Sequence, residues 1–220
     1  MAQIKKGDFI EIEFTGRVAD TGEVFDTNIK SDAEKAKLDI KNIKPFIMSV
    51  GSLMLPEGFD EDLIGKEPEK KYSIELLPEK AFGKRDSKLV RMIPTKLFHE
   101  QKINPEKGMQ LALDGQIVKV LSNSGGRTLV DFNNPLSGKK VSYEYKINRL
   151  VIDEKERVDA IQEFLFRKKF DFEKKDNKII FKVEKQFDPF VKVFAPKFKE
   201  ILGLEVESEI IEKKEVKKNS

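Results

Sequence analysis

Short segments in which every second residue is apolar recur along the first 150 residues, and turn-forming residues separate them. Residues 4–14 read IKKGDFIEIEF, where Ile12 and Phe14 alternate with acidic residues, as is typical of a half-buried strand. Turn residues at 20–22 predict a hairpin to a second strand. The predicted strands lie at 4–14, 23–27, 45–51, 70–77 and 140–150, with a partly helical loop at 29–43 and a short helix at 58–65.

The chain changes character after Gly83. Three apolar segments, MQLAL, QIVKVL and RTLVDF, are separated by Asp114-Gly115 and by a Ser-Gly-Gly run at 124–126. These residues favour hairpin turns, so the segment predicts a small β subdomain of its own.

A different pattern begins at Asp153. Helical stripes are followed each time by a strand-like segment, which predicts an α+β module of about seventy residues. The stripe residues are Val158, Ile161, Phe164 and Leu165 in one helix and Phe194, Phe198, Ile201 and Leu202 in the next. Residues 212–220 are predicted to form a frayed, charged tail.

The content of cysteine and histidine excludes many active-site types. The chain has no cysteine and a single histidine, His99, which we expect to face solvent on a short helix. Disulfides, thiolate nucleophiles and cysteine-based metal sites are therefore excluded. No Gly-x-Ser-x-Gly motif accompanies His99. We predict no cofactor and no bound metal.

Charge and hydropathy restrict the partners. The 42 basic and 39 acidic residues are interleaved and leave a net charge of +3, so nucleic acid is not an expected partner. No segment approaches the ~20 apolar residues of a membrane span, and the amino end has no apolar signal segment. We predict a cytoplasmic protein with no membrane partner.

Four motifs follow in order: FTGRVADTGEVFDT, VGSLMLPEGFDEDLIG, LPEKAFGKRD and VDFNNPLSGKKVSYEYKI. Over residues 4–150 the chain resembles FKBP-type peptidyl-prolyl isomerases, specifically the SlyD-like branch, and the module after 153 resembles the longer archaeal members. The resemblance implies an α+β fold, in which an antiparallel sheet curls over a short helix. It also implies three domains: a discontinuous isomerase domain (1–86 and 136–152), an inserted, β-rich insert-in-flap chaperone domain (87–135) and a C-terminal α+β domain (153–220).

The resemblance also implies an aromatic substrate pocket between the sheet and the helix. Its catalytic residues carry over onto Phe14, Phe25, Asp26, Phe46, Phe59, Phe82 and Tyr143. Met48, Leu55 and Pro56 carry over as substrate-binding residues.

Three positions depart from the family pattern. Phe14 and Phe82 replace residues that usually carry a hydroxyl, and phenylalanine donates no hydrogen bond. Pro56 falls where the family's backbone N–H binds substrate, and proline lacks that donor. An alternative alignment makes Glu57 a one-residue insertion.

The implied activity is cis–trans isomerisation of X-Pro bonds, with Asp26 orienting the rotating carbonyl. The insert is implied to hold unfolded chains as a chaperone. Its expected client-binding residues are Met92, Ile93, Leu97, Phe98, Ile103, Met109 and Leu111, although Met92, Leu97 and Phe98 can equally form the core of the insert.

The expected partners are unfolded polypeptides with X-Pro bonds. Macrolide ligands and a homodimer through the C-terminal domain are further expectations. The alternative function is a non-catalytic, client-binding scaffold that keeps the FKBP architecture, and the departures at Phe14, Phe82 and Pro56 support it.

Overall fold

The structure is a computed structural model that describes residues 3–41, 43–113 and 115–211. The predicted turn residue Asp114 and the predicted tail at 212–220 lie outside these residues. The chain divides into two compact units, which we describe separately. Unit 1 comprises Met1–Thr15, Asp26–Ser73 and Glu144–Ser220, and unit 2 comprises Gly16–Phe25 and Ile74–Tyr143.

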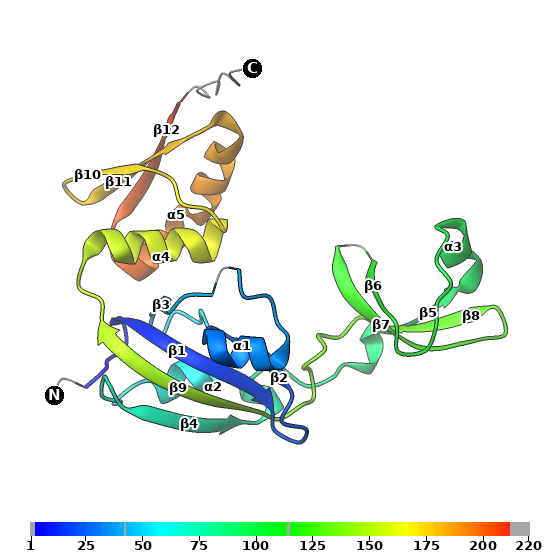
Figure 1. Cartoon of the computed structure of the whole chain (residues 1–220). Helices are drawn as coiled ribbons and strands as arrows, with labels where there is room; N and C mark the ends of the chain where they lie inside the picture. Colours follow the sequence, from blue (N-terminus) through cyan, green and yellow to red (C-terminus); the bar gives the residue numbers. More distant parts are fainter. Residues whose placement is uncertain (1–2, 42, 114, 212–220) are drawn as a thin grey trace, which may run out of the picture. The chain divides into compact units, whose positions relative to one another are not determined.

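A five-stranded sheet in the order β2-β1-β9-β4, with β3 paired antiparallel to β1, contains the predicted strands (Figure 1). Its strands are β1 (Phe9–Val18), β2 (Val24–Thr27), β3 (Phe46–Ser49), β4 (Lys71–Leu76) and β9 (Val141–Leu150). The predicted alternation buries Ile10, Ile12 and Phe14 on β1. The first strand starts later than predicted, because Gly7 adopts a left-handed conformation (φ +89°) in a turn before it.

Two short helices accompany this sheet. The predicted helical loop contains α1 (Lys30–Ala36), and the predicted helix is α2 (Glu57–Asp62). Phe59 and Leu63 are fully buried, whereas Ile64 is 49% exposed, since α2 ends before this residue.

Unit 2 contains a four-stranded antiparallel sheet in the order β5-β8-β7-β6. Its elements are β5 (Val90–Pro94), α3 (Thr95–Glu100), β6 (Gln110–Leu113), β7 (Gln116–Ser124) and β8 (Arg127–Asp131). Phe98 of α3 packs with Val118 and Val130 in its core. The three predicted strands are present, β5 was not predicted, and His99 is exposed on α3 as expected.

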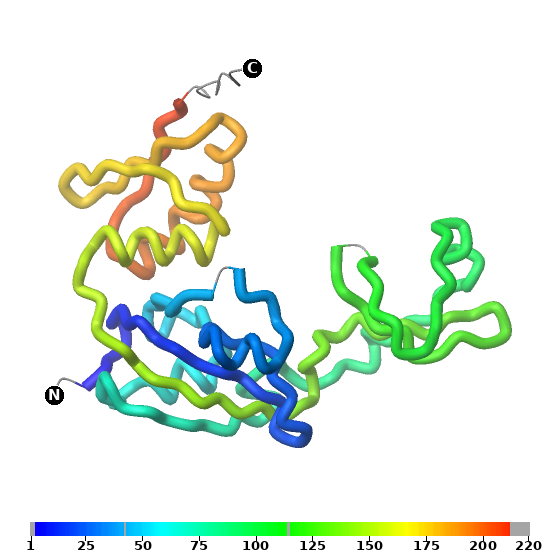
Figure 2. The backbone as a smooth tube through the Cα atoms, viewed as in Figure 1, coloured from blue at the N-terminus to red at the C-terminus, as the bar shows by residue number. Residues whose placement is uncertain are grey.

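The C-terminal module belongs to unit 1 and is α+β. It comprises α4 (Glu154–Phe166), β10 (Phe172–Lys175), β11 (Lys178–Val183), α5 (Asp188–Leu202) and β12 (Glu205–Ile210). β11 pairs antiparallel with β10 and parallel with β12, and α5 connects the parallel pair (Figure 2). Phe166 of α4 and Phe198 of α5 both contact Phe181 of β11 edge to face. Strand β10 was not predicted.

Ion pairs attach α4 to the strands that precede it in the chain. Arg149 of β9 donates to Glu11 of β1 at 2.8 Å and to Glu156 of α4 at 2.9 Å, and Lys44 pairs with Glu163 of α4. These contacts explain why the C-terminal module forms one compact unit with residues of the five-stranded sheet. In the described residues, no helix is both long and apolar enough to cross a bilayer.

Candidate active site

Three predicted pocket residues form one aromatic cluster in unit 2. The ring of Phe25 makes edge-to-face contacts with Phe82, at 5.6 Å between centroids, and with Tyr143, at 5.7 Å. Gly16 makes this packing possible, since a Cβ there would lie 2.7 Å from Phe25 Cζ and 2.8 Å from Tyr143 Cε1. The half-buried ring of Phe25 is therefore fixed by two rings and a glycine.

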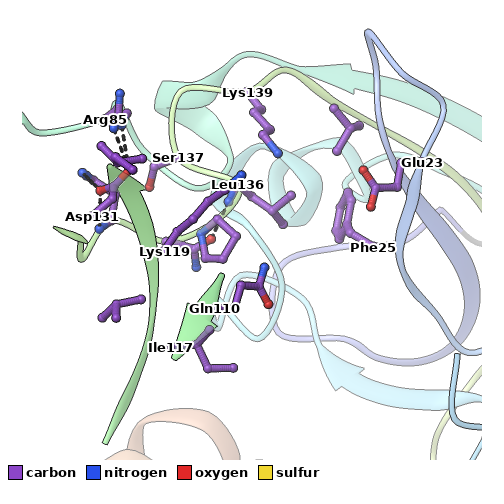
Figure 3. A pocket seen from close by; sticks show the side chains of 16 residues that line it. Glu23, Phe25, Arg85, Gln110, Ile117, Lys119, Asp131, Leu136, Ser137 and Lys139 are labelled. Atoms are coloured by element: carbon purple, nitrogen blue, oxygen red, sulfur yellow. Dashed lines mark hydrogen bonds and ion pairs between the residues drawn. The ribbon is translucent and has the colours of Figure 1, made fainter. Parts of the chain in front are cut away.

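Phe25 also borders a cavity of about 680 Å³ within unit 2 (Figure 3). This volume is in the range of ordinary ligand pockets. The hairpin at 18–25 supplies one part of its wall, the four-stranded sheet another, and the two chain segments that enter and leave this sheet supply the rest. The lining residues are Val18, Glu23, Phe25, Arg85, Gln110, Ile117, Val118, Lys119, Leu121, Asp131, Asn133, Asn134, Pro135, Leu136, Ser137 and Lys139.

The two segments that enter and leave the four-stranded sheet are joined by hydrogen bonds, and we call residues 85–86 and 131–133 the neck. Arg85 donates to Asp131 Oδ2 from Nε at 3.0 Å and from Nη2 at 2.7 Å. The buried Asn133 amide accepts from the Asp86 N–H at 2.8 Å, and donates to the Asp86 carbonyl at 2.9 Å and to Asp131 Oδ1 at 2.7 Å.

Asp131 remains charged in the neck. Partial burial alone would raise its pKa, but the hydrogen bonds from Asn133 and Arg85 outweigh burial and lower it. The sequence motifs AFGKRD and VDFNNPL contain all five neck residues, yet sequence reasoning assigned them no role. In the sequence, the neck residues are visible only as parts of two motifs that flank the insert.

A second aromatic group lies in unit 1. Phe14 contacts Phe59 edge to face at 6.1 Å, and Phe59 contacts Tyr145 at 4.8 Å. Tyr145, which was not predicted, donates from its hydroxyl to Asp62 Oδ2 of α2 at 2.5 Å. Burial and the neighbouring Asp62 carboxylate both raise the pKa of Tyr145, so the phenol stays protonated. This group connects β1 and β9 to α2.

Asp26 follows Phe25 directly on β2. Its side chain retains exposed surface, yet the surrounding protein raises its pKa through desolvation, and the backbone N–H of Thr27 offsets part of that rise. The side chain is thus open to water on one side and partly desolvated by the protein on the other. It can act electrostatically on a nearby dipole.

The other predicted residues of unit 1 lie in different environments. Phe46 of β3 is half-buried and lines a hollow beside α4, whereas Met48 is fully buried in the core and has no surface for substrate. Leu55 and Pro56 are half-buried. Pro56 is the N-cap of α2 and Glu57 is the first residue of the helix.

A buried aspartate, Asp60, holds the loop before Leu55 and was not predicted. Its carboxylate accepts the N–H groups of Gly51 and Leu53, each at 2.8 Å. Desolvation raises the pKa of Asp60, and these two N–H groups offset part of the rise. Leu53 adopts a left-handed conformation (φ 56°) and is 63% exposed. The run of acidic residues in GFDED gave no sign that Asp60 alone would be buried.

The residues expected on the client-binding surface divide between core and surface. Met92 is 60% exposed and Leu97 is 49% exposed, as expected, and Met109 is half-buried. Phe98 lies in the core of the four-stranded sheet, which is the alternative that the sequence left open for it, and Ile93, Ile103 and Leu111 pack against that core and not on the expected surface. Ile117, 62% exposed, is an apolar surface residue that was not predicted.

Comparisons with known proteins identify the family. A family model described as FKBP-type peptidyl-prolyl cis-trans isomerase matches residues 1–107, and one described as FKBP26, IF domain, matches residues 91–136. The short-type peptidyl-prolyl cis-trans isomerase of Methanocaldococcus jannaschii is 32% identical over 146 residues, which cover 66% of this chain and 92% of that protein. The chain therefore belongs to the FKBP-type peptidyl-prolyl cis-trans isomerase family.

Bacterial relatives agree with this assignment. The FKBP-type 16 kDa peptidyl-prolyl cis-trans isomerase of Escherichia coli is 29% identical over 121 residues, covering 53% of this chain and 80% of that protein. The isomerase SlyD of Aeromonas hydrophila is 26% identical over 128 residues, covering 57% of this chain and 55% of that protein. The resemblance stated from the four motifs, and the enzyme class that it implied, are confirmed.

Proposed function

We propose that the chain accelerates cis–trans rotation about X-Pro bonds in polypeptide clients, and that the ring of Phe25, which Phe82 and the buried Tyr143 hold in place, supplies the surface for this reaction. The barrier of ~18–20 kcal/mol arises from amide resonance, which the twisted transition state loses together with much of the amide dipole. A weakly polar environment therefore stabilises the twisted form relative to the planar one. The observation that carries the proposal is the edge-to-face aromatic cluster at the border of the cavity.

In this proposal Asp26 acts through its charge. No bond is made or broken during rotation, so the carboxylate orients the rotating carbonyl and transfers no proton. We expect Asp26→Asn and Asp26→Ala to lower kcat/KM for an X-Pro peptide, measured by NMR exchange. Asp20→Asn in the hairpin turn is the matched control. Full activity of Asp26→Ala would contradict the assigned role.

We propose that residues 87–135 form the inserted chaperone domain of an isomerase domain that comprises 1–86 and 136–152. The family match at 91–136 and the neck support these boundaries. The outer face of the four-stranded sheet is the proposed client surface, because Met92 pairs with Leu129 there and Ile117 is exposed, whereas Ile93 packs into the core. Exposed methionine suits a surface that accepts many sequences.

The test compares two substrates on the full chain. Met92→Ser is expected to slow the refolding of a proline-limited protein while leaving turnover of a short X-Pro peptide unchanged, because Met92 is exposed and does not line the cavity. Lys107→Ser, an exposed change in the same domain, is the control. Equal losses on both substrates would argue against a separate client surface.

The same assays distinguish the alternative function. Phe14 and Phe82 lack the usual hydroxyls, and Pro56 lacks an N–H, which favours a client-binding scaffold without catalysis. Such a scaffold would suppress aggregation of the unfolded protein and accelerate neither substrate. Acceleration of the short peptide excludes it.

We also propose that the C-terminal module forms a homodimer through α5. Phe190 and Val193 are 57% and 72% exposed on this helix, and Phe187 and Phe194 are half-buried beside them. An exposed stripe of this kind is unusual in a monomer. Val193→Asp is expected to convert a dimer to a monomer in light scattering, and a wild-type chain that is already monomeric would refute the proposal.

A further inference from the structure

Two lysines, and one carboxylate besides that of Asp131, line the cavity. Lys119 comes from β7 and Lys139 from the segment between β8 and β9. In the residues that the structure describes, neither forms an ion pair. Arg85, the third basic residue of the cavity wall, is already neutralised by Asp131. The basic groups of the cavity wall that remain are therefore those of the two lysines, and the carboxylate of Glu23 offsets one of their two charges.

The geometry brings these charges to one region. Figure 3 shows the side chains of Lys119 and Lys139 pointing into the cavity from two sides, toward Leu136. Two ammonium groups that face one space repel each other, and an anion between them would replace this repulsion with attraction. Apolar lining residues lie around them, among them Leu121 and Pro135. Such a wall favours an anion attached to an apolar chain over a free, hydrated ion.

We propose that this cavity binds a carboxylate of the client polypeptide, so that the protein favours X-Pro segments with Asp or Glu a few residues from the proline. The inference rests on the proposed function, because it assigns Phe25 to the prolyl segment and the two lysines to the acidic side chain. Glu23, also on the cavity wall, repels a client carboxylate that approaches Phe25.

The expected size of the preference for acidic segments follows from the solvent exposure of the two lysines. Both lysines are exposed, and an exposed ion pair contributes a factor of about 1.4 to 5 in binding. Two such pairs predict a preference of about two- to 25-fold for an acidic segment over its amide isostere. Because exposed pairs are screened, the preference should largely disappear at 0.5 M salt.

The experiment measures kcat/KM by NMR exchange for a set of ten-residue peptides with one Leu-Pro bond. Asp, Asn or Lys is placed in turn at each position from three residues before the proline to four after it. With the full wild-type chain, one or two adjacent positions should show a preference of about two- to 25-fold for Asp over Asn, expressed in KM. Lys at those positions should be the poorest substrate.

Variants then assign the preference to the cavity. Lys119→Gln with Lys139→Gln should abolish it, and Lys119→Glu with Lys139→Glu should reverse it in favour of Lys peptides. Lys107→Glu makes the same change of charge at an exposed residue elsewhere in the segment that contains the four-stranded sheet, and it should leave the preference for Asp over Asn intact. Equal kcat/KM for Asp and Asn at every position, or a preference that survives the double Gln variant, would overturn the inference. Absence of turnover for every peptide would instead refute the proposed isomerase function.

Discussion

The neck offers a direct test of how the four-stranded sheet is held, through the substitution Asn133→Ala. The Asn133 side chain makes three hydrogen bonds, two with the backbone of Asp86 and one with the Asp131 carboxylate. The change to alanine removes all three and leaves the Arg85–Asp131 pair in place. It therefore isolates the part of the neck that depends on a single buried amide.

The magnitude can be estimated from the partners. A neutral hydrogen bond contributes ~1 kcal/mol and one to a carboxylate ~2 kcal/mol, which gives a sum of ~4 kcal/mol. Water can reach the partly exposed Asp86 and Asp131 once the amide is gone. We therefore expect a local destabilisation of ~2–3 kcal/mol, equivalent to a factor of about 30 to 150 in the opening equilibrium.

Amide hydrogen exchange measures this opening locally, which matters because a chain with two units need not unfold in one step. The N–H of Asp86, bonded to Asn133 in the wild type, should exchange about 30 to 150 times faster in Asn133→Ala. Asn104→Ala, an exposed change in the same sheet-containing segment, is the control. An Asp86 exchange rate that changes less than threefold would refute the reasoning.

Three further outcomes follow from contacts in the two units. Gly16→Ala should cost ~1–3 kcal/mol in thermal unfolding and lower kcat/KM for an X-Pro peptide, because the new Cβ displaces the rings of Phe25 and Tyr143. Asp131→Asn should destabilise the folded protein most near pH 7. A carboxyl group whose native pKa is lowered stabilises the folded state above its unfolded pKa of ~3.9, and this stabilisation is lost as the pH falls through the native pKa. The unfolding curves of the wild type and the variant should therefore converge toward pH 3. Tyr145→Phe should cost ~1.5–3 kcal/mol in denaturant unfolding, equally at pH 6 and pH 9, because the phenol stays protonated at both.

Most strands were predictable because alternation is a local property of the sequence. Residues 9–18 alternate strongly enough to be recognised before any partner strand is known. Strands β5 and β10 were missed for a related reason: VRMIP does not alternate cleanly, and FEKK contains one apolar residue. Their pairing with β8 and β11 stabilises them, and that pairing is not visible locally.

The aromatic cluster could be predicted from family motifs, but the contacts that hold it could not. The neck joins residues 46 or 47 positions apart, and nothing in either segment alone specifies the partner. The same limit applies to the insert, where Met92 and Ile93 are adjacent, similar in hydropathy and opposite in burial. Adjacent side chains on a strand point to opposite faces of the sheet, and α3 covers only one of these faces. The sequence alone does not show which face that is.

The loss of two hydroxyls bears on how the family's chemistry is carried out in this chain. Phe82 still contacts Phe25 edge to face, and Phe14 still contacts Phe59, so both rings keep their packing partners. What is lost is hydrogen bonding, which phenylalanine cannot supply. Aromatic desolvation of the twisted amide requires only the rings, whereas polarisation of the substrate carbonyl by a tyrosine requires the hydroxyl. If the chain is an efficient isomerase, the rings and the Asp26 charge must therefore provide most of the stabilisation of the transition state.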